Sequence, residues 1–136
     1  MKLKILPPTL RINNHYLTLD IKSEDKLDKT ELVSAIWHAS LRLYGEIETS
    51  AFNLWLMRFY DITDSTENSD NYSQKPQNNN DFHYYHFKAI LRCQTGYEDK
   101  VRGSLALLSK YNHKKIAIST IGISGTIASS IEKFIN

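Results

Sequence analysis

The chain has 136 residues and a mass of 15.7 kDa, which suits one domain and leaves too little apolar surface for two separate cores. Its 41% hydrophobic and 24% charged residues exclude general disorder, and its single cysteine, Cys93, excludes an intrachain disulfide and favours a reducing compartment. Residues 61–81 carry a net charge of −4 and the remainder +6, so the basic remainder suits either a polyanionic partner or an ordinary solvated surface.

The first half of the chain alternates between strand and helix patterns. Apolar residues alternate over 16–22, which predicts a strand, and helical spacing then predicts a helix over 28–45 that begins at a capping box and ends at a glycine. Two more strands are predicted over 51–60 and 82–93. Between them, residues 61–81 are acidic, rich in asparagine and nearly free of aliphatic side chains, so we expect a mobile loop.

The second half continues with helix, strand and helix. A capping box from Thr95 to Glu98 predicts a second helix, 116–121 a fourth strand, and Ser124 the cap of a short amphipathic helix. The order β-α-β-β-α-β predicts one α+β domain over residues 1–136, a ferredoxin-like or RNA-recognition-motif-like sandwich. Such a sandwich is a four-stranded antiparallel sheet with two helices on one face. The additional C-terminal helix is expected to cover the open face of the sheet or a partner.

Few side chains form a pattern that could carry chemistry. His83 and His86 lie three apart on a predicted strand and so point to opposite faces, which disfavours a shared metal ion. Cys93 fits a small buried strand residue better than a nucleophile. The sequence shows no phosphate-binding loop and no dinucleotide fingerprint. We therefore predict no catalytic residue, no metal site and no cofactor in this chain.

Two features are candidates for RNA binding. The segment 124–126 joins a strand to a helix start, where free backbone N–H groups either bind phosphate or are capped by the hydroxyl side chains. On the third strand, Arg92 and Lys88 share one face with Tyr84 and His86. Aromatic and cationic groups side by side suit bases and phosphates, a protein interface, or a plain solvated face. For each of these residues, the sequence leaves open whether it contacts RNA, a protein partner or solvent.

Short motifs occur in a characteristic order along nearly the whole chain. They are LPPTLR at 6–11, ELV at 31–33, AIW at 35–37, LYGE at 43–46, NLWL at 53–56, LRC at 91–93, VR with SLAL at 101–107 and GISGT at 122–126. Together they resemble the family of archaeal ribonuclease P protein component 2, which includes a small subunit of eukaryotic nuclear RNase P and RNase MRP. The long acidic loop, and Glu48 where a glycine is common, depart from the family pattern without touching the other motifs.

The resemblance implies a non-catalytic subunit of ribonuclease P, the endonuclease ribonucleoprotein that removes the 5′ leader from precursor tRNA. The RNA subunit and its Mg²⁺ ions would perform the chemistry in the cytoplasm. Expected partners are the RNase P RNA, the barrel-shaped component 3, other RNase P proteins, precursor tRNA as substrate of the complex, and a second copy of the chain. Candidate RNA-binding residues are Arg11, Arg92, Arg102, Lys88, Ser124, Gly125 and Thr126. Candidate protein-interface residues are Ile127, Ile131, Phe134, Ile135, Leu41 and Leu107.

Two alternative functions come from other classes. A free-standing RNA-recognition-motif-like module would expose aromatic residues on the first and third strands, where Tyr16 and Tyr84 are available. A small ligand-sensing or acyl-phosphate enzyme domain would need a glycine-rich anion loop near Arg11, and that segment lacks glycine. No apolar stretch approaches the roughly 20 residues of a membrane span, and the first residues lack a signal-peptide core. We therefore expect a cytoplasmic protein with no membrane partner.

Overall fold

Strands and helices follow the predicted order, with one strand added. The structure is a computed structural model, and it describes residues 13–63 and 84–135. Its elements are β1 (Asn14–Ser23), α1 (Lys29–Ala51), β2 (Trp55–Asp61), β3 (Tyr85–Gln94), α3 (Glu98–Ala106), β4 (Lys110–Tyr111), β5 (Lys114–Ser124), α4 (Ile127–Ser130) and the π-helical turn η2 (Ile131–Ile135). The candidate residue Arg11 and the greater part of the predicted loop, 64–81, lie outside the described residues.

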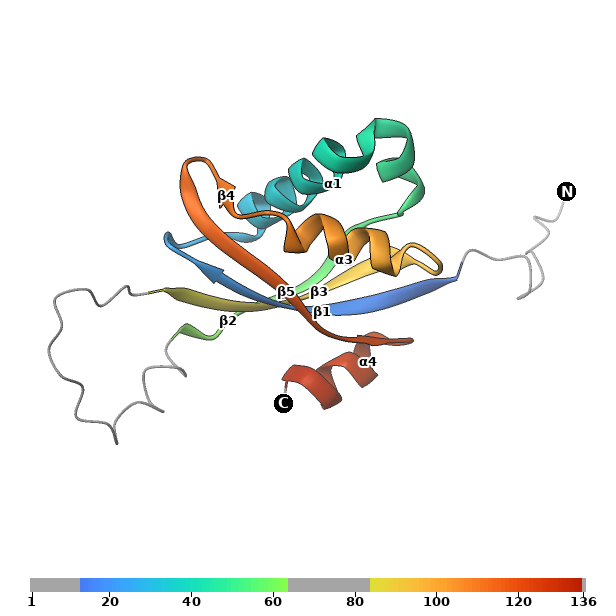
Figure 1. Cartoon of the computed structure of the whole chain (residues 1–136). Coiled ribbons are helices and arrows are strands. Elements are labelled where there is room, and N and C mark those ends of the chain that lie inside the picture. Colours follow the sequence, from blue (N-terminus) through green and yellow to red (C-terminus); the bar gives the residue numbers. More distant parts are fainter. Residues whose placement is uncertain (1–12, 64–83, 136) are drawn as a thin grey trace, which may run out of the picture.

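The described strands form a five-stranded antiparallel sheet in the order β2-β3-β1-β5-β4. Helices α1 and α3 lie over one face of this sheet, and α4 lies against the other (Figure 1). The register shifts between Thr18 and Leu19 of β1 and between Leu56 and Arg58 of β2. Such bulges increase the local twist, which curls the sheet. The α+β class predicted from the sequence is confirmed.

The added strand is β4, which pairs Lys110 with Lys115 of β5. Four strands were predicted because a two-residue strand is too short to show an alternating pattern. Asn112 and His113 have φ angles of 50° and 65°. Positive φ at both central residues is the conformation of a type I′ hairpin turn, whose twist matches that of the paired strands. The turn therefore creates a short hairpin ahead of the predicted strand.

The main hydrophobic core lies between the sheet and the two covering helices. Alternate residues of β1 and β3 face the helices, because side chains alternate across a strand. Buried members from β1, β3 and α1 include Leu17, Leu19, Ile21, Phe87, Ala89, Leu91, Leu32, Ala35 and Ile36. The intervening residues of the same strands are thereby directed to the open face, as predicted for Lys88 and Arg92.

Helix α1 begins where its capping box predicts and continues beyond the predicted end. The Asp28 carboxylate accepts a hydrogen bond from the Glu31 backbone N–H at 2.7 Å. Gly45 was expected to end the helix, and it instead kinks it, with φ 79° and ψ 177°, before a last stretch reaches Ala51. A glycine adopts this left-handed conformation without the steric cost that a side chain would impose. The predicted helix end at Gly45 was therefore wrong, because the glycine kinks the helix without ending it.

Helix α3 begins differently from its predicted capping box. Its N-cap residue is Tyr97, which makes no side-chain capping bond. The Glu98 carboxylate accepts from the Gly96 N–H at 2.8 Å and contacts Nδ1 of His15 on β1 at 2.5 Å. Burial acts to raise the pKa of Glu98, but these bonds outweigh it and hold the pKa below its ordinary value of 4.5. The stability contributed by this carboxylate is therefore present above pH 4.5 and is lost as the pH falls through the lowered pKa.

Candidate nucleic-acid interface

The open face of the sheet, away from α1 and α3, presents cross-strand rows of side chains. Residues paired in register on neighbouring strands lie on the same face. Each row runs across β2, β3, β1 and β5 in that order. The first row is Trp55, Arg92, Tyr16 and Ser124, the second is Arg58, Ile90, Thr18 and Gly122, and the third is Tyr60, Lys88, Asp20 and Ser119. Aromatic and basic side chains are thus interleaved on β2 and β3, a composition that suits bases and phosphates.

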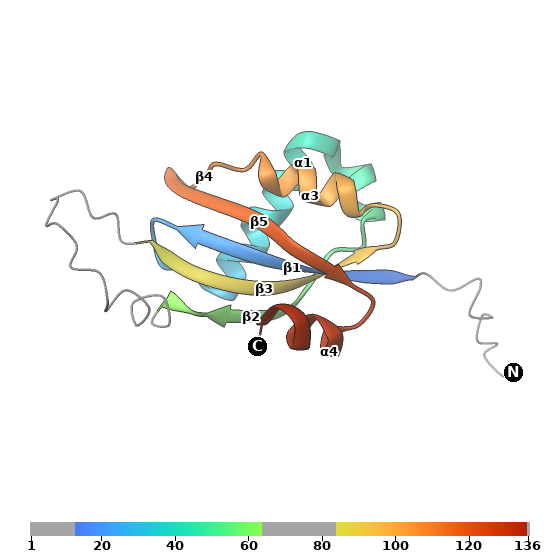
Figure 2. The same cartoon turned by 60° about the horizontal axis from the view of Figure 1, so that its bottom comes forward.

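The C-terminal helix occupies the middle of this face, and Figure 2 shows it lying across the sheet. Thr18 and Ile90 of the second row are completely buried. The Phe134 ring packs on Gly122 so closely that a Cβ atom there would have no room. Lys88 donates a hydrogen bond from Nζ to the Phe134 carbonyl at 3.0 Å. The helix therefore covers the open face, one of the two positions expected for it, and Lys88 holds its end.

The turn into this helix is capped by its own side chain. Thr126 Oγ1 accepts the backbone N–H of Ser129 at 3.1 Å, so Thr126 and not the predicted Ser124 is the N-cap. Ser124 is buried at the end of β5, where it pairs with Tyr16. Gly125 is exposed. Of the two roles expected for 124–126, capping is present, and a phosphate contact stays a prediction.

The β2 end of the first row remains accessible at the edge of the sheet. Trp55 on the edge strand β2 is 62% exposed, and Cζ of Arg92 lies 5.9 Å from the centroid of its ring, within cation–π range. Arg92 donates from Nε to the Asn53 carbonyl at 3.3 Å and from Nη2 to the Asn53 side-chain oxygen at 3.2 Å. Asn53 donates in turn to the side-chain oxygen of Asn14 at 3.0 Å. This network fixes the guanidinium beside the indole.

Arg102 lies apart from the other candidate RNA-binding residues. It is exposed on α3, on the opposite side of the sheet, with Nη1 3.7 Å from a carboxylate oxygen of Asp99 one helical turn away. Exposed pairs of this kind contribute little stability. The structure thus brings Arg92, Lys88 and Ser124 to one face and leaves Arg102 on the other.

The candidate protein-interface residues fall into two groups. Those of the C-terminal helix are partly buried, namely Ile127, Ile131, Phe134 and Ile135. Leu41 of α1 and Leu107 just after α3 are exposed on the helical side of the sheet, Leu107 at 60%. Arg42 Nη2 donates to the Leu107 carbonyl at 3.3 Å, which ties the two helices together at this point. Leu41 and Leu107 are therefore open to a partner.

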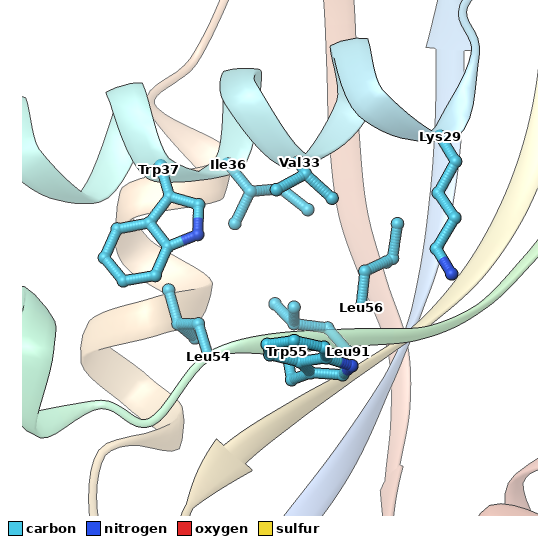
Figure 3. Close-up of a pocket in the computed structure, with 8 residues that line it drawn as sticks. All are labelled: Lys29, Val33, Ile36, Trp37, Leu54, Trp55, Leu56 and Leu91. Carbon is cyan, nitrogen blue, oxygen red and sulfur yellow. The ribbon is translucent and has the colours of Figure 1, made fainter.

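An apolar cleft of about 230 Å³ lies between α1 and β2 (Figure 3). Val33 and Trp37 point toward it from α1, and Leu56 lines it from β2. The Trp55 indole lies on the far side of β2 from α1, while Lys29 marks the edge of the cleft. Trp55 is also among the residues that line the cleft, so the Trp55–Arg92 pair lies at its border.

Comparison with known proteins identifies the family. The model of the Rpp14/Pop5 family matches residues 15–135. The chain belongs to the Rpp14/Pop5 family. A relative from Methanobrevibacter smithii is 48% identical over 135 residues, covering 99% of this chain and 98% of the relative. Relatives from Methanothermobacter thermautotrophicus (38%; 98% and 94% covered) and Pyrococcus abyssi (36%; 100% and 96% covered) are also similar, and all three are named Ribonuclease P protein component 2.

Several titratable groups of this Rpp14/Pop5 chain have structural partners. His86 Nε2 and Asp20 Oδ1 form a close hydrogen bond on the open face. His83, the other histidine considered for a metal, lies outside the described residues. Over 13–63 and 84–135, no three His, Cys, Asp or Glu side chains gather where they could hold a metal ion.

Across the same residues, 13–63 and 84–135, no helix is both long enough and apolar enough to cross a bilayer.

We expect the Cys93 thiol to resist iodoacetamide at mildly alkaline pH while the protein is folded. Cys93 is completely buried, and burial together with the nearby Glu98 raises its pKa to about 12. The reactive thiolate is therefore scarce. Mass spectrometry should show modification only after unfolding in urea. Rapid alkylation in native buffer would show that β3 opens readily and would contradict the burial.

Sequence reasoning missed Trp55 as the neighbour of Arg92. The signal lies in the alternation of Leu54, Trp55 and Leu56, since two buried leucines on a strand direct the residue between them to the opposite face. Their pairing could not be predicted, because the two residues lie far apart in the sequence. Only the register of β2 on β3 brings Trp55 and Arg92 together.

Proposed function

We propose that this chain is a protein subunit of ribonuclease P, the ribonucleoprotein that removes the 5′ leader from precursor tRNA. The observation that carries the proposal is its match, over 99% of its length and at 48% identity, to a relative named Ribonuclease P protein component 2. In this proposal, the RNA subunit and its Mg²⁺ ions cleave the substrate in the cytoplasm. The protein supports the catalytic RNA and contributes no catalytic residue.

The charge of the open face supports contact with RNA. Lys22, Arg58 and Arg92 project from it, and the acidic group among them, Asp20, is paired with His86. Lysine and arginine beside exposed aromatic rings favour a phosphate backbone with accessible bases. We place the main RNA contact of the chain on this face, with Arg92 and the 124–126 turn as its members.

The apolar residues on the helical side support a protein partner. Besides Leu41 and Leu107, helix α1 exposes Leu43 and Ile47, which is 90% exposed. A partner that covered these side chains would remove their apolar surface from water, which favours association. We propose that this side binds the component 3 subunit or a second copy of the chain, so that RNA and protein partners occupy opposite sides of the sheet.

The alternative of a free-standing RNA-recognition-motif-like module fits the open face less well. Such modules bind RNA across the central strands of the sheet. Here the middle of that surface holds the C-terminal helix, and Thr18 and Ile90 of the central strands are completely buried. We also interpret the strand order β2-β3-β1-β5 as a ferredoxin-like arrangement extended by β4, within one domain.

Reconstitution of precursor-tRNA cleavage tests the proposed function. We expect cleavage by the cognate RNA and the remaining protein subunits to fall at limiting Mg²⁺ when this chain is left out, and to recover when it is added back. Higher Mg²⁺ should partly replace the protein, because the catalytic ions belong to the RNA. Cleavage that is equally fast with and without the chain at every Mg²⁺ concentration would contradict the proposal. An Arg92→Ala chain that folds and binds RNA normally, yet supports no cleavage of precursor tRNA at any Mg²⁺ concentration, would contradict the supporting role.

A further inference from the structure

The exposure of Trp55 is unusual for so large an apolar side chain. Tryptophan gains most from burial, yet Trp55 is 62% exposed on an edge strand, whereas the flanking Leu54 and Leu56 are buried. The C-terminal helix covers Thr18 and Ile90 in the next row and leaves this ring accessible. The chain therefore keeps an indole in solvent at the border of its basic face.

The arginine beside the ring is held in place before any ligand arrives. Two hydrogen bonds to Asn53 fix Nε and Nη2 of Arg92. Asn53 itself has φ 54°, in the left-handed region that a non-glycine residue adopts only at some cost, and the side chain of Asn14 holds it there. Within residues 13–63 and 84–135, the hydrogen bonds of the Arg92 side chain come from Nε and Nη2, and Nη1 donates none. Two of the five N–H donors of the guanidinium are thus used, and the three others, two on Nη1 and one on Nη2, are left for a ligand.

We propose that Trp55 and Arg92 form a stacking site for an unpaired RNA base, an inference that rests on the RNA-binding role proposed above. The base would stack on the indole, and the Nη1 donors of Arg92 would contact the adjoining phosphate. Stacking on aromatic side chains requires a base outside a duplex, because paired bases are already stacked on each other. The ligand class is therefore a single-stranded segment, a loop or a bulge.

A purely structural role for the pair is weaker, because removal of a ring already in solvent would cost the fold little. A protein partner is the other occupant that an exposed tryptophan and arginine would suit. The surrounding charge favours RNA, since Arg58 and Lys22 share the face and its Asp20 carboxylate is paired with His86. The net charge of the side chains around the pair is therefore positive, which attracts a polyanion such as RNA.

The test compares binding of two labelled RNAs by the full-length chain at several salt concentrations. One is a single-stranded RNA of about 12 nucleotides, within the site size usual for such surfaces, and the other is the same RNA annealed to its complement. We expect Trp55→Ala to weaken single-strand binding by about 10- to 100-fold with the salt dependence unchanged, because stacking releases no ions. Duplex binding should not change. Trp55→Phe should keep most of the affinity, and Arg92→Ala should reduce the salt slope by about 1.

Ile123→Ala is the matched control, because Ile123 is an exposed apolar residue whose partner in register, Leu17, faces the helices, so that it lies on the opposite side of the sheet. It should leave both RNA affinities unchanged. The proposal is overturned if the wild-type chain does not bind the single strand, or if Trp55→Ala binds it normally. A Trp55→Ala chain that binds RNA normally but no longer joins the other protein subunits would assign Trp55 to a protein interface. In each of these cases, dependence of precursor-tRNA cleavage on the chain would still uphold the proposed function.

Discussion

Replacing Phe87 by alanine is expected to lower the free energy of unfolding by about 3–5 kcal/mol, as for other fully buried aromatic residues. Phe87 has no exposed surface, and its ring stacks on that of Phe59 with centroids 5.2 Å apart and planes at 24°. It also pairs in register with Ile21 at the centre of the sheet. The substitution removes these contacts and leaves a cavity that rigid strands cannot close. The total free energy of unfolding of a small domain is about 5–15 kcal/mol, so this loss would be a large share of it.

Urea denaturation measures this effect, and an unchanged slope would show that only stability is altered. Trp55→Ala is the matched control, because it removes a larger ring from the neighbouring strand but from an exposed position. We expect it to change stability by no more than about 0.5 kcal/mol. If Phe87→Ala cost as little as the control, the sheet and helices could not be close-packed at this point. The same control confirms that the Trp55 variant is folded in the RNA-binding test.

The hydrophobic periodicity of the sequence predicted the elements well, because each central strand turns one face to the core and the other away from it. The alternation of Leu17, Leu19 and Ile21 gave the face of β1, and that of Phe87 and Ala89 gave the matching face of β3, as the structure confirms. From those two patterns, the placement of Lys88 and Arg92 on the open face follows without any tertiary information. A local rule is sufficient wherever burial repeats every second residue.

The departures occur where a tertiary contact decides a local choice. Ser124 looked like a helix cap, but β5 extends through it to pair with Tyr16, so the cap moves to Thr126. Thr95 looked like another cap, but its own N–H is bonded to the carbonyl of Asn13, and Glu98 turns to His15. In each case, residues distant in sequence supply a partner that a capping motif alone cannot reveal.

The same limit applies to the candidate site. Sequence reasoning selected Arg92 but could not pair it with Trp55, since their contact depends on strand register next to a bulge. It selected Lys88 for RNA, and the structure gives its ammonium a carbonyl of the C-terminal helix. Arg102 lies on α3, across the sheet from both. Three basic residues that look equivalent in the sequence thus have three different surroundings.

Replacing Gly122 by alanine is expected to displace the C-terminal helix from the sheet. The new Cβ would overlap the Phe134 ring, which packs directly on the glycine backbone. The ring would have to leave the glycine by changing its rotamer or by shifting the turn whose carbonyl Lys88 holds. Overpacking of this kind costs about 1–3 kcal/mol. Displacement would also expose Ile90, which is completely buried on the same face.

Gly125→Ala is the matched control, since nothing lies within 4 Å of a Cβ at that position. Hydrogen exchange distinguishes a local from a global effect. In the Gly122 variant, the Ser130 amide, which donates to the Thr126 carbonyl at 3.1 Å, should lose protection, while amides of β1 and β3 keep it. Unchanged protection of Ser130 in a stable Gly122→Ala protein would show that the helix does not rest on Gly122. Fast exchange of Ser130 in the wild-type chain would show that the helix already leaves the face in solution, which would open the central strands to RNA and favour the recognition-motif-like mode of binding.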